Sequence, residues 1–506
     1  MKADRVVIVG AGMGGLAAAL ELAHRGCAVT VVEAAAVPGG KMRRVETDLG
    51  PVDAGPTVFT MRGIFDALFE TVGESLDEVV SLTPLAVLAR HAWGEGPSLD
   101  LYADVERSAD AIGSFAGAAG ARGYRRFAAD SHRIFDLLDA RFMQAPRPSL
   151  VGLASGLGLS GLAIRPFETL WRALGSYFED PRLHQLFGRY ATYCGSSPFM
   201  APATLMLVAH AEQAGVWTIR GGMQELARAL AGLAAARGTQ FRYGTAVESI
   251  MVENGTARGV RLAGGETIAA DAVVWNGDAG ALWRGLAGPA VARATPATDP
   301  QTRSLSAVTW CLAAKAAGFP LAFHNVFFSA DYRAEFDAIM TRGCLPDRPT
   351  VYLCAQDRSD EGPPPTGPER LFCLVNAPPA ADTGRPADEE IARCEATMMD
   401  CLRGAGLSLE ITSRAVTGPR DFARLFPGTG GALYGMATHG AMASFRRPGS
   451  RTAIPRLYLA GGSVHPGPGV PMAAISGRLA ARTVTEDLIS RPVSIRTAMP
   501  GGMSTH

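Results

Sequence analysis

The sequence predicts an α/β fold, in which a parallel sheet covered by helices receives an inserted α+β domain. A short β-branched run, Arg5 to Val9, leads directly into a glycine-rich turn and then a helical pattern. A similar strand–glycine–helix unit begins at Leu457, near the other end of the chain. Long segments with helical and strand patterns separate the two units. We therefore expect a Rossmann-like domain interrupted by inserts, because units of this kind build parallel sheets.

The first unit carries a specific motif. Residues Gly10 to Gly15 satisfy the pattern G-x-G-x-x-G between the predicted strand and the helical pattern. Gly10 permits the tight turn, Gly12 lets the backbone approach a pyrophosphate, and Gly15 lets the helix pack closely on the strand. The helix N-terminus would favour phosphates through its free N–H groups and its dipole. The motif predicts a dinucleotide site, and a signal peptide over Met1 to Leu20 is the less specific alternative.

The segment after the motif distinguishes between two common dinucleotide cofactors. A second strand, Cys27 to Val32, ends in Glu33, whose carboxylate can accept hydrogen bonds from ribose hydroxyls. An NAD domain would then continue its alternating strands and helices. This chain instead has glycine-rich loops, Pro38 to Arg43 and Val52 to Thr57, which can lie along an extended cofactor. The sequence therefore favours FAD.

The unit near the carboxyl end supports this interpretation. The strand Leu457 to Ala460 runs into the pair Gly461-Gly462, and a helical pattern, Met472 to Ile489, follows the stretch His465 to Pro471. We expect the N-terminus of that helix to face the flavin N1/C2=O region, where it would stabilise the negative charge that forms on reduction.

The middle of the chain returns to the nucleotide-binding domain. An amphipathic helix follows the turn Gly221-Gly222, and a β-meander follows that helix. Asn254-Gly255 marks a hairpin turn of the meander, and Asp271 to Trp275 is a further strand. Val247, at the start of the meander, is placed to touch the adenine.

Composition narrows the possible functions. The 506 residues include 48 Lys+Arg and 48 Asp+Glu, so binding to nucleic acid through bulk positive charge is excluded. With 47% hydrophobic and 19% charged residues, the chain hints at an apolar ligand or a membrane face. Its eight cysteines form no C-x-x-C pair, which argues against a metal site and suits a reducing compartment.

Two segments stand apart from these patterns. The uncharged run Leu150 to Ile164 is too short to span a membrane and suggests a membrane-dipping or buried segment. Residues 491–506 look like a loosely ordered tail.

These motifs together resemble the FAD-dependent carotenoid desaturases of the phytoene desaturase type. The matching segments are Val9 to Gly15, Gly39 to Lys41, Asp53 to Thr57, Tyr193 to Thr204, Trp217 to Met223 and Leu457 to Pro471. Within this family the chain is most similar to the hydroxycarotenoid 3,4-desaturases (methoxyneurosporene dehydrogenases) of purple bacteria, through Gly55 to Met61 and Ser196 to Trp217.

The resemblance implies a fold of the flavin amine oxidase and glutathione reductase type. Residues 1–75, 215–285 and 450–490 would form a discontinuous FAD-binding domain. Residues 76–214, which show mostly helical patterns, and 286–449, which show strand patterns, would form the inserted α+β substrate and membrane-access domain. An antiparallel sheet and helices would lie over the flavin. No cysteine follows Cys401, so the FAD should be non-covalent, unlike that of many related amine oxidases.

The implied reaction is the 3,4-desaturation of an acyclic hydroxy- or methoxy-carotenoid, for example of 1-hydroxyneurosporene to demethylspheroidene. An allylic CH2 would lose a hydride to flavin N5, and the neighbouring carbon would lose a proton. Because the polyene delocalises the cation, the protein needs mainly to align the substrate and exclude water. A quinone or oxygen would then reoxidise the flavin. We expect a cytoplasmic protein peripherally associated with the inner, photosynthetic membrane.

The expected site can be stated residue by residue. The cofactor-binding candidates are Gly10, Gly12, Met13, Gly14, Gly15, Glu33, Ala34, Gly40, Lys41, Met42, Gly55, Pro56, Thr57, Val247, Gly461, Gly462, Pro471 and Met472. The substrate candidates are His210, Trp217 and His465, for which packing, surface or turn-shaping roles are the alternative. No catalytic acid–base group or metal ligand is assigned. Phytoene desaturation or another carotenoid oxidation is an alternative activity, and a non-enzymatic binding protein on the same fold, as in Rab GDP-dissociation inhibitors, is an alternative of another class.

Overall fold

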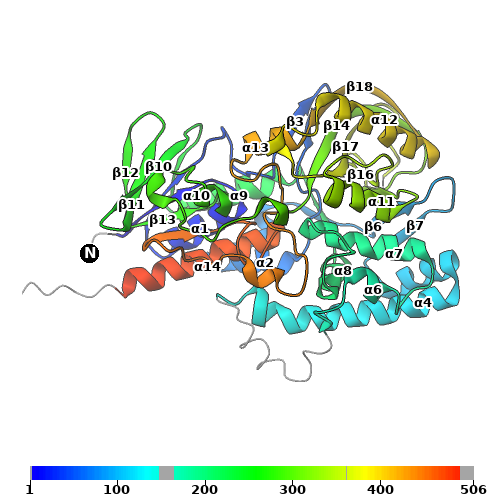
Figure 1. Ribbon diagram of the computed structural model, residues 1–506, viewed down its shortest axis with the longest axis horizontal. Coiled ribbons are helices and arrows are strands. Elements are labelled where there is room, and N and C mark those ends of the chain that lie inside the picture. Colours follow the sequence, from blue (N-terminus) through cyan, green and yellow to red (C-terminus); the bar gives the residue numbers. More distant parts are fainter. Residues whose placement is uncertain (1–2, 147–163, 361, 491–506) are drawn as a thin grey trace, which may run out of the picture.

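The structure is a computed structural model that describes residues 3–146, 164–360 and 362–490 (Figure 1). The predicted tail, 491–506, lies outside the described residues. The predicted membrane-dipping run, 150–164, also lies outside them except for Ile164. Of the helices within the described ranges, none combines the length and the apolar composition needed to cross a membrane.

A five-stranded parallel sheet forms the first layer, in the order β19-β13-β1-β2-β9. Its strands are β1 (Arg5–Val9), β2 (Ala28–Val32), β9 (Gln240–Arg242), β13 (Ala272–Trp275) and β19 (Leu457–Leu459). Their β-branched and apolar residues are mostly buried, as expected for a sheet covered on both faces. The predicted parallel sheet is thus confirmed, and it joins segments from both ends of the chain.

Helices cover this sheet. They include α1 (Met13–His24), α2 (Arg62–Glu70), α3 (Leu76–Val79), α9 (Gln224–Ala236), α10 (Ala279–Trp283) and α14 (Val470–Ile489). Helices α1 and α14 lie side by side (Figure 1), and a Cβ added at Gly477 would lie 2.1 Å from the Gly14 carbonyl oxygen. A glycine in α14 therefore allows this close approach of the two helices.

Three small sheets complete the fold. The predicted meander is confirmed as β10 (Val247–Glu253), β11 (Thr256–Leu262) and β12 (Thr267–Ala269), which pair antiparallel. A hairpin joins β3 (Arg44–Thr47) to β4 (Gly50–Asp53), and β5 (Leu82–Pro84) pairs with β8 (Trp217–Ile219).

A seven-stranded sheet forms the second main layer, in the order β18-β14-β17-β16-β15-β6-β7. Its strands are β6 (Val87–Ala92), β7 (Leu99–Tyr102), β14 (Ser306–Gly318), β15 (His324–Phe327), β16 (Val351–Ala355), β17 (Glu369–Ala377) and β18 (Leu407–Thr417). Every neighbouring pair is antiparallel except β15 and β6. The expected antiparallel sheet is present. The first insert, which was predicted to be mostly helical, also supplies three strands, β5, β6 and β7. The sequence does not reveal them, because short strands that carry residues such as Arg90 lack a clear apolar period.

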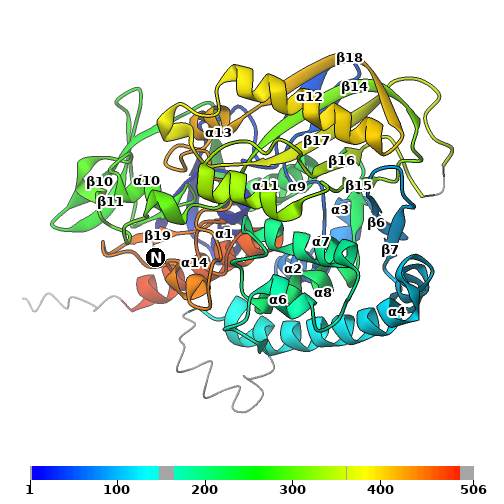
Figure 2. The same ribbon diagram turned by 45° about the vertical axis from the view of Figure 1, so that its right-hand side comes forward.

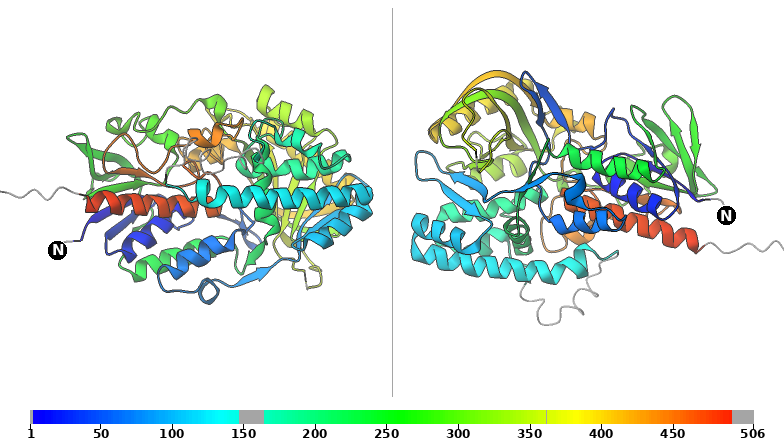
Figure 3. Two further views of the ribbon diagram at one scale, coloured as in Figure 1. Left: turned by 90° about the horizontal axis from the view of Figure 1, so that it is seen from below. Right: turned by 180° about the vertical axis from the view of Figure 1, so that it is seen from behind.

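Helices flank this second sheet on both faces. Helix α12 (Asp388–Gly404) lies across β14 and β17 (Figure 2), where Cys394, Met398 and Leu402 enter the core. The other helices are α4 (Val105–Leu138), α6 (Leu170–Leu174), α7 (Pro181–Gly188), α8 (Leu207–Gln213), α11 (Tyr332–Asp337) and α13 (Pro419–Leu425), with a short 3-10 helix η3 (Arg189–Cys194). Seen from below, α4 and α14 run along the same side of the molecule (Figure 3).

Candidate active site

A cavity of about 1170 Å³ is lined by residues of both large sheets. One part of its lining, here called the glycine wall, consists of most residues of the segments 9–14, 32–43, 54–57 and 461–473, without His465. The other, here called the sheet wall, consists of residues from β14 to β17 together with η3 and the start of α11. Seventeen of the cofactor candidates line the cavity; they are Gly10, Gly12, Met13, Gly14, Glu33, Ala34, Gly40, Lys41, Met42, Gly55, Pro56, Thr57, Val247, Gly461, Gly462, Pro471 and Met472. The structure thus brings together candidates from both ends of the chain.

Gly15 is the one cofactor candidate that does not line the cavity. A Cβ at this position would lie 2.1 Å from the Gly10 carbonyl oxygen, so the residue permits the contact between α1 and the turn before it. A Cβ on Gly14 would lie 2.7 Å from the Gly461 nitrogen. The two glycine motifs therefore meet backbone to backbone.

The glycine wall fits an extended dinucleotide. Helix α1 begins after Gly12 without a side-chain cap and without an acidic residue in its first turn, so its first N–H groups are available to an anion. A Cβ on Gly40 would lie 3.1 Å from the Gly12 Cα, so the absence of a side chain at Gly40 lets its loop approach the glycine turn closely. Glu33 lies beside this turn and accepts hydrogen bonds from the backbone nitrogens of Ala11 (2.6 Å) and Ala35 (2.8 Å).

The N-terminus of a second helix, α14, also lies at the cavity. Helix α14 begins after Gly469, whose φ of 113° is accessible to glycine, and again has neither a side-chain cap nor an acidic first turn. Pro471 lies in its first turn, where a missing N–H costs nothing. Pro471 and Met472 both line the cavity, so the positive end of this helix dipole is directed at its contents.

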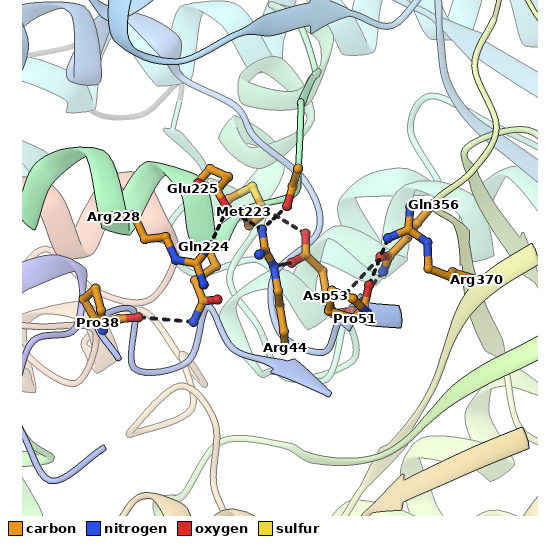
Figure 4. Close-up of polar contacts among 11 residues, drawn as sticks. Pro38, Arg44, Pro51, Asp53, Met223, Gln224, Glu225, Arg228, Gln356 and Arg370 are labelled. Atoms are coloured by element: carbon orange, nitrogen blue, oxygen red, sulfur yellow. Dashed lines mark hydrogen bonds and ion pairs between the residues drawn. The ribbon is translucent and has the colours of Figure 1, made fainter. Parts of the chain in front are cut away.

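A half-buried carboxylate, that of Asp53, connects the two walls. Asp53 accepts a hydrogen bond from the Met223 nitrogen (2.7 Å), and Arg44 lies 3.5 Å away (Figure 4). The Asp53 backbone and the Gln356 side chain exchange two hydrogen bonds, each 2.9 Å long. Burial raises the pKa of Asp53, while the Met223 N–H and Arg44 lower it. This cluster attaches the loop that leads to Thr57 both to the turn before α9 and to the end of β16.

The sheet wall contains a buried ion pair within its mostly apolar lining. Arg189 Nη2 lies 2.9 Å from Glu212 Oε1, and both side chains are buried. The hydroxyls of Tyr190 (2.8 Å) and Tyr193 (2.5 Å) donate to the same carboxylate, and Arg189 donates to Tyr193 (2.8 Å). Burial lowers the pKa of Arg189, but the charge of Glu212 outweighs it and leaves that pKa well above its usual value.

Comparison with known proteins identifies the family. The model of the family described as "Flavin containing amine oxidoreductase" matches residues 13–485. The chain belongs to this family. It is 54% identical to a hydroxyneurosporene desaturase of Rubrivivax gelatinosus, over 100% of this chain and 98% of that protein. It is 49% identical to a hydroxyneurosporene desaturase of Cereibacter sphaeroides, over 96% and 98%. A phytoene desaturase of Neurospora crassa is 28% identical, over 97% of this chain and 86% of that protein.

The fold also matches solved structures. An oxidoreductase from Methanosarcina mazei aligns with a TM-score of 0.60 at 17% identity, over 95% of this chain and 100% of that one. This match concerns the fold alone. The family model and the desaturase relatives show that the protein is a flavin-dependent oxidoreductase, and its predicted membership of the desaturase family is confirmed.

None of the three predicted substrate candidates of this oxidoreductase lines the cavity. His210 stacks on His132 at 4.3 Å, behind the sheet wall. Trp217 packs edge-on against Phe59 at 6.3 Å. His465 is buried against the Phe142 ring, and burial lowers its pKa to about 4. The structure therefore gives these side chains packing contacts, while their sequence neighbours Pro466 and Leu207 reach the cavity.

Sequence reasoning missed several residues of this flavoenzyme's cavity. Asn276 donates to the Gly10 carbonyl oxygen (3.1 Å) and lies between both glycine motifs. Arg447 is buried, and it donates to the carbonyl oxygens of Tyr434 (3.1 Å) and Met436 (2.6 Å). Burial lowers the pKa of Arg447 to about 10. Asn276 directly follows a parallel strand, a position where ligands commonly bind, and that signal could have identified it.

Proposed function

We propose that the protein is an FAD-dependent desaturase that introduces the 3,4 double bond into an acyclic hydroxy- or methoxy-carotenoid, for example 1-hydroxyneurosporene. The observation that carries this proposal is a large, mostly apolar cavity against the glycine wall, in a chain 54% identical to a hydroxyneurosporene desaturase. Phytoene desaturation is less favoured because the corresponding relative is only 28% identical. A GDI-like binding protein is not favoured either, since the family consists of flavin oxidoreductases.

A bound flavin would supply the acceptor for the hydride that leaves the substrate. The chain itself contributes alignment and exclusion of water. The sheet wall holds the polyene against the glycine wall, and its buried apolar residues keep water from the developing cation. The N-terminus of α14 provides positive potential for the charge that the cofactor gains.

The cofactor is proposed to be FAD, held without a covalent bond. The candidates of the glycine wall would bind it, with Glu33 at the ribose, Val247 at the adenine, and Gly10, Gly12 and Met13 at the pyrophosphate. Cys194 also lines the cavity, but burial raises the pKa of its thiol to about 11. A neutral thiol is a poor nucleophile, which supports non-covalent binding. Residues 1–75, 215–285 and 450–490 would thus bind FAD, and 76–214 and 286–449 the substrate.

The substrate is proposed to enter from a membrane surface. Exposed apolar side chains line the cavity; they are Phe167 (92% exposed), Leu286 (51%), Leu425 (50%), Val37 (42%) and Met442 (39%). Exposed groups of this kind favour contact with lipid or another apolar partner. We therefore propose a cytoplasmic protein bound peripherally to the inner membrane, with a quinone or oxygen as electron acceptor.

The test uses liposomes that contain either 1-hydroxyneurosporene or phytoene, with the FAD-loaded protein and a quinone. A red shift of the polyene absorption bands is expected with the hydroxylated substrate only. A shift with phytoene only would overturn the proposed substrate, and no shift with either would overturn the proposed reaction. Release of yellow FAD on denaturation would support non-covalent binding, whereas retention of the flavin by the unfolded chain would contradict it.

A further inference from the structure

We propose that Thr57, oriented by Tyr352 and His324, donates a hydrogen bond to the oxygen at the end of the carotenoid and thereby selects oxygenated substrates. This inference rests on the proposed function and names the residues that would carry its specificity. Thr57 follows Gly55-Pro56 on the glycine wall, whereas Tyr352 lies on β16 of the sheet wall. The proposed contact lies where the two walls meet.

The three side chains form a hydrogen-bonded chain. Thr57 Oγ1 lies 2.6 Å from Tyr352 Oη, which lies 2.7 Å from His324 Nδ1. Thr57 and Tyr352 line the cavity and are partly accessible, whereas His324 is buried behind them. The other ring nitrogen of His324, Nε2, is buried and has no hydrogen-bond partner among the described residues.

The protonation of His324 determines the direction of this chain. Burial, aided by the charge of Arg189, lowers the pKa of His324 to about 3, so the ring is neutral and carries one N–H. A buried N–H without a partner is rarer and more costly than an unused lone pair. The proton therefore lies on Nδ1 and is donated to Tyr352 Oη. Tyr352 then donates its own proton to Thr57 Oγ1.

Thr57 is consequently left with a hydroxyl proton that Tyr352 and His324 do not use, and its other polar neighbour is the weakly accepting sulfur of Cys354. Because the side chain lines the cavity, this proton is available to a ligand. Tyr193, another hydroxyl on the cavity, differs in this respect. It donates to Glu212 (2.5 Å) and accepts from Arg189 (2.8 Å), so its only hydroxyl proton is already used.

The loop that carries Thr57 is held firmly in place. Asp53, four residues earlier, exchanges two hydrogen bonds of 2.9 Å with Gln356, which directly follows β16 (Figure 4). Two contacts thus attach this loop to the same strand, through Gln356 and through Tyr352. A donor on such a rigid support can discriminate between ligands, because little freedom is lost when it binds.

The position of Thr57 suits the chemistry of the proposed reaction. In a 1-hydroxy- or 1-methoxy-carotenoid the oxygen is on C1, only two carbons from C3, so the group that binds it must lie beside the reacting carbons. Thr57 is adjacent to the proposed cofactor residues Gly55 and Pro56. A donor binds a hydroxyl or an ether oxygen equally. An unsubstituted end group would bury the Thr57 proton without an acceptor, which costs free energy.

The experiment compares Thr57→Val, which removes the donor at nearly constant shape, with Thr57→Ser, which retains it. Each FAD-loaded protein is given 1-hydroxyneurosporene or neurosporene in liposomes with a quinone. The ratio of kcat/KM for the two substrates is expected to fall roughly 5- to 150-fold in Thr57→Val and to stay near the wild-type value in Thr57→Ser. Tyr102→Phe removes a hydroxyl on β7, outside the cavity lining, and serves as the control, with an unchanged ratio. Anaerobic carotenoid binding, measured by the absorption shift of the polyene, should follow the same order.

Several results would overturn the inference. An unchanged ratio in Thr57→Val, or an equal fall in Tyr102→Phe, would show that Thr57 does not recognise the oxygen. Weakened FAD binding in Thr57→Val with an unchanged ratio would assign the hydroxyl to the cofactor. If Thr57→Val does not fold, Tyr352→Phe is the second variant, and it should lower the ratio in the same direction but less. If the wild-type protein desaturates neither substrate, the proposed function is wrong. If it desaturates them and the kcat/KM ratio is the same in wild type and variants, only the role of Thr57 is wrong.

Discussion

The two walls of the cavity are built in different ways. The glycine wall presents backbone groups, and its shape depends on residues without side chains, such as Gly10 (φ 102°) and Gly461 (φ 109°). The sheet wall presents side chains, including Arg189, which pairs with the buried Glu212, and Tyr352, which contacts the buried His324 and Thr57 of the glycine wall. The first wall suits a ligand common to a large family, and the second suits a ligand that differs between relatives.

The comparison explains what each wall should tolerate. A backbone cradle fails when a Cβ fills it, since no rotamer change can relieve the contact. A wall of side chains instead fails when one polar partner is removed and the other is left buried alone. The predictions below test this difference, from the largest expected effect to the smallest.

Gly15→Val should abolish flavin binding. Its Cβ would lie 2.1 Å from the Gly10 carbonyl oxygen, so the turn and α1 would have to separate. We expect a colourless protein by visible absorption and a lower unfolding temperature. Gly232→Ala in α9 is the control, because a Cβ there meets nothing within 4 Å. Full flavin content in Gly15→Val would contradict a backbone-built site.

Glu212→Leu should be the most damaging single change on the sheet wall. It leaves the buried Arg189 without its carboxylate and removes the acceptor of two tyrosine hydroxyls. Breaking a buried pair in this way costs about 3–5 kcal/mol of unfolding free energy. Urea denaturation would measure the loss. Glu106→Ala, in an exposed pair with Arg125, should leave the transition almost unchanged, and equal losses in both variants would refute the argument.

The glycine wall was largely predictable from the sequence because its parts are local. A strand, a glycine turn and a helix lie within consecutive residues, so the motif from Gly10 to Gly15 specifies both fold and ligand class. The parallel sheet and the meander were predicted for the same reason, whereas the antiparallel sheet was expected from the family resemblance. The family resemblance then supplied what local patterns do not, namely the identity of a substrate class.

The sheet wall was not predictable, because its polar groups come from distant segments. Thr57, His324 and Tyr352 belong to different elements, and no spacing in the sequence indicates that they meet. The substrate candidates were chosen from residues near glycine motifs, and the structure places their side chains in packing contacts outside the cavity lining. A turn reverses direction, so the side chain next to a cavity-lining residue can face the core, as His465 does beside Pro466.

Asp53→Asn should moderately lower both the stability of the protein and its affinity for FAD, since Asp53 attaches one wall to the other. The amide keeps one acceptor for the Met223 N–H but loses the charge that faces Arg44. Hydrogen bonds to charged groups contribute roughly 1.5–3 kcal/mol, so we expect a loss of about 2 kcal/mol in urea denaturation together with weaker FAD binding. Asp66→Asn, in a partly exposed pair with Arg62, is the control and should change neither quantity. A stability loss with intact FAD binding would mean that the cluster does not support the cofactor loop.

The smallest effect should be a pH dependence that belongs to the sheet wall. Glu335 is buried behind it and accepts hydrogen bonds from Thr350 and Ser329, yet burial raises its pKa to about 7. Between its usual pKa near 4.5 and 7, the folded protein holds a proton that the unfolded chain has lost, so stability falls as the pH rises through this range. Glu335→Gln has no such proton. The stability of the wild type relative to this variant should therefore fall by roughly 1 kcal/mol for each pH unit between pH 5 and 7.

The comparison with Glu335→Gln isolates this group from others that titrate nearby. Burial lowers the pKa of His324 to about 3 and that of His439 to about 4, so both make stability rise with pH, but both are present in wild type and variant alike. Urea denaturation at several pH values measures the difference. Glu106→Gln provides the flat reference, because the hydrogen bond from Arg125 lowers the pKa of Glu106 and keeps it ionised throughout. A flat difference for Glu335→Gln as well would mean that Glu335 is ionised in the folded protein and that water or a cation reaches the space behind the sheet wall.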